Sequence, residues 1–75
     1  MSGYSIDDFR RDLEQQLAPH SILIDLVDAT DTDITVETRR INGTDLRRTV
    51  TLSVTQLTPV MTRRFAEIVE DAYRG

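Results

Sequence analysis

The chain has 75 residues, so we expect a single small domain spanning 1–75 whose core is modest in size. It contains no cysteine, which excludes disulfides and thiolate metal sites as sources of stability. Nine arginines and no lysine face thirteen acidic residues, and the net charge of −4 disfavours binding to a polyanion. This acidic, lysine-free composition suggests a GC-rich genome or a halophile. No stretch is apolar enough for a membrane span or a signal peptide, so we expect a cytoplasmic protein that does not bind membranes.

The first predicted helix lies in "SIDDFRRDLEQQL". Ser5 is the predicted N-cap, and Asp8 three residues later completes a capping box. Pro19 closes the helix, because the residue before a proline avoids helical dihedral angles. Apolar residues recur at spacings of 3, 4 and 4, which predicts one buried stripe: Ile6, Phe9, Leu13 and Leu17.

Three segments rich in Thr, Val and Ile then predict strands over 21–27, 33–40 and 46–54. The last segment predicts a second helix with Thr58 as N-cap and Pro59 at its first position. The order α-β-β-β-α predicts an α+β fold, a three-stranded antiparallel meander with two helices packed on one face. The apolar face of the second helix is expected to contain Met61, Phe65, Ile68, Val69, Ala72 and Tyr73.

The stretch "RRINGTDLRR" joins the second and third strands. Only an odd-numbered loop places the apolar residues of both strands on one face, so we predict a three-residue loop, 41–43, with Gly43 in a left-handed conformation. That register pairs Arg39 with Asp45 and Glu37 with Arg47. A register shifted by one residue at each end sets Arg39 against Arg47, and we reject it because the charges are alike.

The remaining arginines have two interpretations. Arg40 and Arg48 fall on the face covered by the helices, where the simpler interpretation is a solvated head group on a stem that packs along the core. The alternative is an anion-binding surface formed with the pair at the start of the second helix: Arg40, Arg48, Arg63 and Arg64.

The element order resembles that of the double-stranded RNA-binding domain, in which a basic cluster opens the second helix. "RRFAE", with Arg63 and Arg64, is similar to that cluster, and the resemblance implies phosphate binding at these residues. The loop that would enter the RNA groove reads "DATDTD", however, and its carboxylates would repel a phosphate backbone.

The acidic residues Asp25, Asp28, Asp31 and Asp33 lack the glycine and distal glutamate of a calcium loop, so we predict no metal site. His20 is the only histidine, and we expect it to cap a helix or lie in solvent. Since no catalytic constellation or phosphate-binding loop is present, we predict no enzyme and no cofactor.

The alternation in the first strand places Ile22, Ile24 and Leu26 inside and leaves apolar side chains on the open face of the sheet. Such faces mark partner surfaces, here Leu23, Val27, Thr35, Thr49 and Thr51. The alternative is a strand buried on both sides by residues around Tyr4. The leading hypothesis is a non-enzymatic protein–protein interaction module that forms a homodimer or binds another protein, and the alternative is a nucleic-acid or phosphate-binding module.

Overall fold

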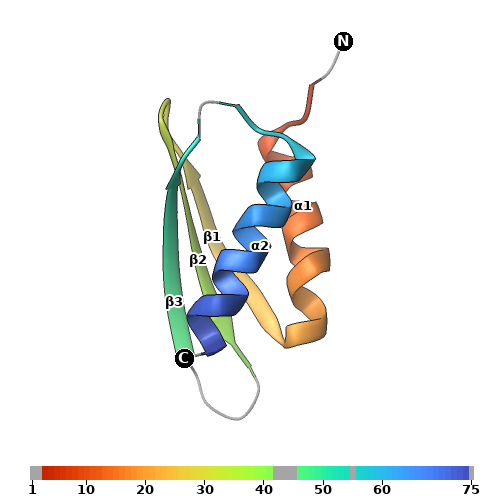
Figure 1. The fold of residues 1–75 in the computed structure, drawn as a ribbon, viewed down its shortest axis with the longest axis vertical. Coiled ribbons are helices and arrows are strands. Elements are labelled where there is room, and N and C mark those ends of the chain that lie inside the picture. The colour runs from red at the N-terminus through yellow and green to blue at the C-terminus, as the bar shows by residue number, and fades with distance from the viewer. Residues whose placement is uncertain (1–2, 42–45, 55, 75) are drawn as a thin grey trace.

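The computed structural model describes residues 3–41, 46–54 and 56–74. Its elements follow the order α1 (Ile6–Leu17), η1 (Ala18–His20), β1 (Ile22–Ala29), β2 (Asp33–Arg40), β3 (Leu46–Ser53) and α2 (Pro59–Arg74). The three strands form an antiparallel sheet in the order β1-β2-β3. Both helices pack on one face, with α1 over β1 and α2 over β3 (Figure 1). The predicted fold class is therefore confirmed.

The start of α1 is the predicted capping box. The Ser5 hydroxyl accepts a hydrogen bond from the Asp8 N–H at 3.2 Å, and Asp8 Oδ2 accepts one from the Ser5 N–H at 3.0 Å. These bonds, the backbone one foremost, together with the Arg11 guanidinium, lower the pKa of Asp8 below its ordinary value. Ile6 was expected in the buried stripe but is 36% exposed.

In α2, the Thr58 hydroxyl accepts a hydrogen bond from the Met61 N–H at 3.2 Å, as expected of an N-cap. The face that α2 buries is rotated from the predicted one. Thr62 and Ala66 are buried although neither was predicted, whereas Met61 and Ile68 are only partly buried. The Thr62 hydroxyl can be buried because it donates to the Thr58 carbonyl and lies 2.8 Å from the Tyr4 hydroxyl.

The predicted register between β2 and β3 is wrong. Arg39 lies opposite Arg47, which is the pairing rejected on charge, and Glu37 lies opposite Thr49. The parity argument is nevertheless confirmed, since Ile34 faces Leu52 and Val36 faces Val50 on the core side. Both registers leave the same apolar residues on the core side, so burial does not decide between them. The like-charge pair is tolerated because the Arg39 charge is neutralised by Asp25 of β1. The predicted conformation of Gly43 lies outside the described residues.

A bulge at Asp25 interrupts β1. Ile24 faces Thr38, but Leu26 faces Glu37, so Asp25 is an extra residue between two paired positions. The bulge inverts the alternation in the second half of the strand. Leu26, predicted inside, is on the open face and 45% exposed. Val27, predicted on the open face, lies opposite Val36 and packs against the core.

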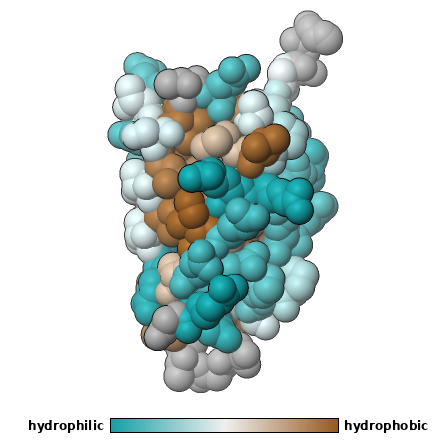
Figure 2. Space-filling model, viewed as in Figure 1, coloured by the Kyte–Doolittle hydropathy of each residue, from teal (hydrophilic) through white to brown (hydrophobic). Residues whose placement is uncertain are grey.

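The core is mainly aliphatic and lies between the sheet and the two helices. Its aromatic centre is Phe9 of α1 against Phe65 of α2, with ring centroids 5.1 Å apart in an edge-to-face arrangement. Apolar side chains also reach the surface between β3 and α2 (Figure 2). Leu52 of β3 and Met61 and Ile68 of α2 are only partly buried. Within the described ranges, neither helix has the length and apolar character needed to cross a membrane.

Candidate functional site

The open face of the sheet is not covered by either helix (Figure 1). It contains two neighbouring apolar side chains, Leu23 and Leu26, which are 41% and 45% exposed. Beside them lie the predicted threonines, and the hydroxyls of Thr35 and Thr51 are 2.9 Å apart. Thr49 is also exposed on this face. Four of the five predicted interface residues therefore share one surface, and the bulge replaces Val27 by Leu26.

Charged residues surround the two leucines. Leu23 lies opposite Arg39, and Leu26 lies opposite Glu37. Arg39 Nε is 3.1 Å from Asp25 Oδ1. This contact is an ion pair without a directed hydrogen bond, because in the described part of the chain no acceptor is in line with that N–H. Across the strands, the open face therefore has a basic row, in which Leu23 lies beside Arg39, and an acidic row, in which Leu26 lies beside Glu37.

Arg40 and Arg48 lie on the helix side of the sheet, as predicted, and both bind the C-terminal end of α2. Arg40 donates to the Tyr73 carbonyl at 3.4 Å, and Arg48 Nε donates to the Ala72 carbonyl at 3.2 Å. The last carbonyls of a helix lack partners within the helix, so these arginines cap it from the neighbouring strands. The Arg48 guanidinium also lies over the Tyr73 ring, 5.7 Å from its centroid.

The four arginines of the predicted anion-binding surface do not come together. Arg64 precedes Tyr73 by nine residues, which separates the two by about 14 Å along the axis of α2. At the end of α2, Arg74 pairs with Asp71 at 3.3 Å. Among the described residues, none of these four arginines (Arg40, Arg48, Arg63 and Arg64) pairs with a carboxylate.

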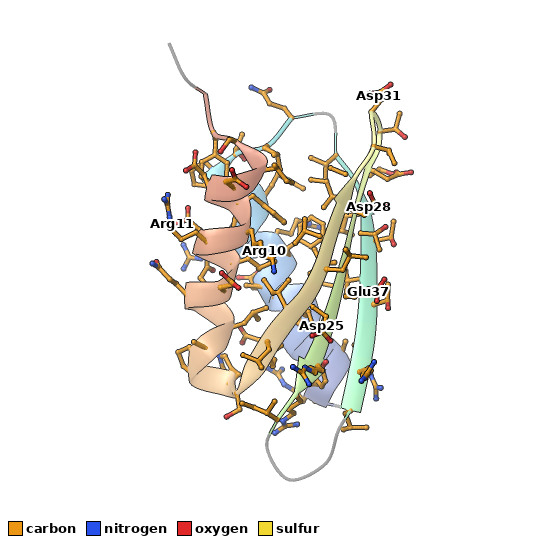
Figure 3. All side chains as sticks on the ribbon, turned by 180° about the vertical axis from the view of Figure 1, so that it is seen from behind. Arg10, Arg11, Asp25, Asp28, Asp31 and Glu37 are labelled. Carbon is orange, nitrogen blue, oxygen red and sulfur yellow. The ribbon has the colours of Figure 1, made fainter. Side chains whose placement is uncertain are left out.

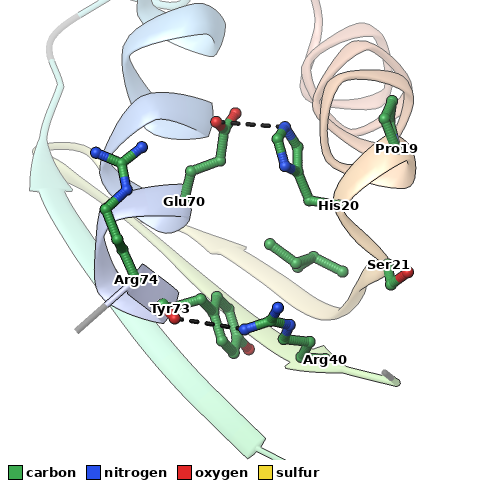
Figure 4. A pocket seen from close by; sticks show the side chains of 8 residues that line it. Pro19, His20, Ser21, Arg40, Glu70, Tyr73 and Arg74 are labelled. Carbon is green, nitrogen blue, oxygen red and sulfur yellow. Dashed lines mark hydrogen bonds and ion pairs between the residues drawn. The ribbon is translucent and has the colours of Figure 1, made fainter. Parts of the chain in front are cut away.

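A pocket of about 380 Å³ lies beside the C-terminal turn of α2 (Figure 4). His20 Nε2 lies 3.3 Å from Glu70 Oε1, so the only histidine of the sequence contacts α2 while its side chain stays half exposed to solvent. This contact and the Arg40 bond to Tyr73 both connect α2 to the other elements. The pocket is lined by Pro19, His20, Ser21, Ile22, Arg40, Glu70, Tyr73 and Arg74.

The side chain of Tyr73 anchors the same turn from inside. It is 8% exposed, and its hydroxyl lies 2.9 Å from the Thr38 hydroxyl and 3.3 Å from the Leu46 carbonyl. His20, Arg40 and Tyr73 therefore hold the end of α2 against the rest of the fold, a role that sequence analysis assigned to none of them. Their partners are more than 25 positions away in the chain, so no local pattern could identify them.

The acidic residues of β1 and the following loop are spread along the molecule, with Asp25, Asp28 and Asp31 at successive heights (Figure 3). Asp33 instead accepts a hydrogen bond from the Ser53 hydroxyl at 3.2 Å. Within residues 3–41, 46–54 and 56–74, no three acidic or histidine side chains gather as ligands for a metal ion.

Compared with known proteins, the chain matches no family model, no curated protein and no solved structure.

Proposed function

We propose that the protein is a cytoplasmic, non-enzymatic interaction module that self-associates through the open face of its sheet. The observation that carries the proposal is the bulge at Asp25, which places Leu23 and Leu26 next to each other on a face that neither helix covers. Two neighbouring exposed leucines on an otherwise polar sheet are an apolar patch available to a partner. A second copy of the chain is the partner that the charges of this face favour.

The charges also select one orientation of the two copies. A two-fold axis in the plane of the sheet, across the strands and between the two rows, places Leu23 of one copy over Leu26 of the other. The same operation places Arg39 over Glu37, so both rows are complementary. An axis parallel to the strands would instead place Arg39 over Arg39, which like-charge repulsion disfavours.

The size of the face predicts a weak complex. Each strand has eight residues and is about 26 Å long, and three strands about 4.8 Å apart are about 14 Å wide. The footprint is therefore about 370 Å² per copy, about half of the roughly 800 Å² that a standard interface buries on each partner. We expect dissociation constants on the order of 10 μM to 1 mM.

Sedimentation equilibrium across that concentration range tests the proposal. The wild-type protein should change from monomer to dimer, and Leu26→Asp should remain a monomer because it places a carboxylate in the apolar centre. Val60→Asp is the matched control, since Val60 is 75% exposed but lies on α2, on the other side of the sheet. Monomeric wild-type protein at every concentration would refute the proposal, and so would equal effects of both variants.

A further inference from the structure

The edge of the sheet formed by β3 is open to pairing with another strand. Val54 N–H bonds to the Thr32 carbonyl, and the register between β2 and β3 continues from that pair without irregularity. In an antiparallel ladder the bonded pairs alternate, so the even-numbered residues of β3 bond to β2. The N–H and C=O groups of the odd-numbered residues, among them Thr49, Thr51 and Ser53, therefore point away from the sheet.

The two edges of the sheet differ in this respect. The bulge at Asp25 disrupts the edge formed by β1, and bulges are among the devices that hinder pairing with another chain. No bulge interrupts β3, which has eight paired residues and contains no proline. The outward carbonyl of Arg47 is already used, since it accepts a hydrogen bond from the Arg48 side chain at 2.9 Å.

An apolar seam runs beside this edge, between β3 and α2 (Figure 2). Ala72 of α2 is at the β3 side, because its carbonyl accepts the bond from Arg48. Ile68 lies one turn before Ala72 on the same side of the helix, and Met61 lies two turns before Ile68. We define the seam as Val50, Leu52, Met61, Ile68 and Ala72, all buried or partly buried.

Two arginines lie beside the seam, one next to Ala72 and one between Met61 and Ile68 along the helix axis. Arg48 is beside Ala72, and Arg64 lies one turn from both Met61 and Ile68. In the described part of the chain neither pairs with a carboxylate, although the protein as a whole is negative. Within residues 3–41, 46–54 and 56–74, Arg48 contacts two neutral carbonyls and the Tyr73 ring, so both charges are available to a partner.

We propose that the β3 edge and the seam bind an extended acidic peptide segment as a fourth strand. Ala72, beside Arg48, and Arg64 are eight residues apart on α2, which is about 12 Å. An extended strand covers that distance in about four residues, and residues four apart point to the same side. The segment therefore has two carboxylates four residues apart and an apolar residue midway, which lies over Ile68. Main-chain bonds supply affinity, and the alternate side chains supply specificity.

This surface consists of the main-chain edge of β3 and the seam on the helix side, whereas the proposed self-association uses side chains on the open face, so the two proposals can fail separately. The probe is a capped peptide, Thr-Asp-Thr-Leu-Thr-Asp-Thr, titrated into the Leu26→Asp protein and followed by amide chemical shifts. We expect saturable shifts along β3 and along α2 between Arg64 and Ala72, with a dissociation constant on the order of 1 mM or below. A peptide with both Asp replaced by Asn should bind about tenfold more weakly.

Matched variants separate the two parts of the proposal. Thr51→Pro removes an outward N–H that the β2 ladder does not use, so the fold should persist while strand addition is lost. Arg64→Gln should weaken the peptide about tenfold, whereas Arg63→Gln, on the other flank of α2, should leave it unchanged. No saturation in the Leu26→Asp protein, unchanged binding in a folded Thr51→Pro variant, or equal effects at Arg63 and Arg64 would each overturn the proposal. If Thr51→Pro unfolds, the arginine pair and the Asn peptide decide.

Discussion

The bulge at Asp25 makes a prediction that separates two adjacent residues of β1. Val27 faces the core opposite Val36, so Val27→Asp places a carboxylate against apolar side chains. Loss of apolar burial and desolvation of the carboxylate should together cost about 3 kcal/mol or more. Leu26 is 45% exposed and faces Glu37, so Leu26→Asp should cost about 1 kcal/mol, from partial burial and a like-charge neighbour.

These costs are large compared with the stability of the domain, which for 75 residues is about 4–11 kcal/mol. Urea denaturation at low protein concentration measures both variants. With a slope of about 1 kcal/mol per molar urea, the midpoint should fall by about 3 M for Val27→Asp and by about 1 M for Leu26→Asp. Leu23→Asp, on the open face before the bulge, should resemble Leu26→Asp. An equal or reversed order for the variants at 26 and 27 would refute the bulge.

Three further predictions concern hydrogen bonds that hold the helices. The pKa of Asp8 is lowered, so its carboxylate stabilises the folded state above pH about 4, and this stabilisation is lost as pH falls. Asp8→Asn should therefore lower the melting temperature at pH 7, and the difference from wild type should vanish in acid. Burial, and next the hydrogen bond to Asp12, raise the pKa of Tyr4, so wild type should lose stability relative to Tyr4→Phe as pH rises above about 10. Urea denaturation of both proteins at pH 9 and at pH 11 measures this. A difference in unfolding free energy between the two proteins that is the same at both pH values would disprove it. Tyr73→Phe removes the buried bond to Thr38 and should cost about 1–2 kcal/mol in chemical denaturation, and an unchanged midpoint would contradict it.

The helices were predictable because their signals are local. The capping box of Ser5 and Asp8 and the Thr58–Pro59 start each depend on residues within one turn of one another, and the structure confirms both. Parity in the hairpin was predictable for the same reason, since alternate burial along two adjacent strands fixes which residues share a face. These patterns were sufficient for the fold class and for four of the five residues predicted on the open face of the sheet.

Long-range pairing was not predictable from such patterns. The register was misassigned because the charge of Arg39 is balanced by Asp25, on a strand that the hairpin argument did not include. The bulge at Asp25 has no local signature, yet it exchanges Leu26 for Val27 on the candidate interface. The contact between His20 and Glu70 joins residues fifty positions apart.

The sequence by itself determined the elements, their order and the two-layer arrangement, because amphipathic periodicity and caps act between near neighbours in the chain. Only the tertiary structure decided how the strands align, which arginines cap α2 and which apolar residues stay exposed. Those outcomes depend on side chains from different elements competing for the same space and charge. The candidate surfaces, Leu23 with Leu26 on the open face and the seam beside β3, belong to this second group.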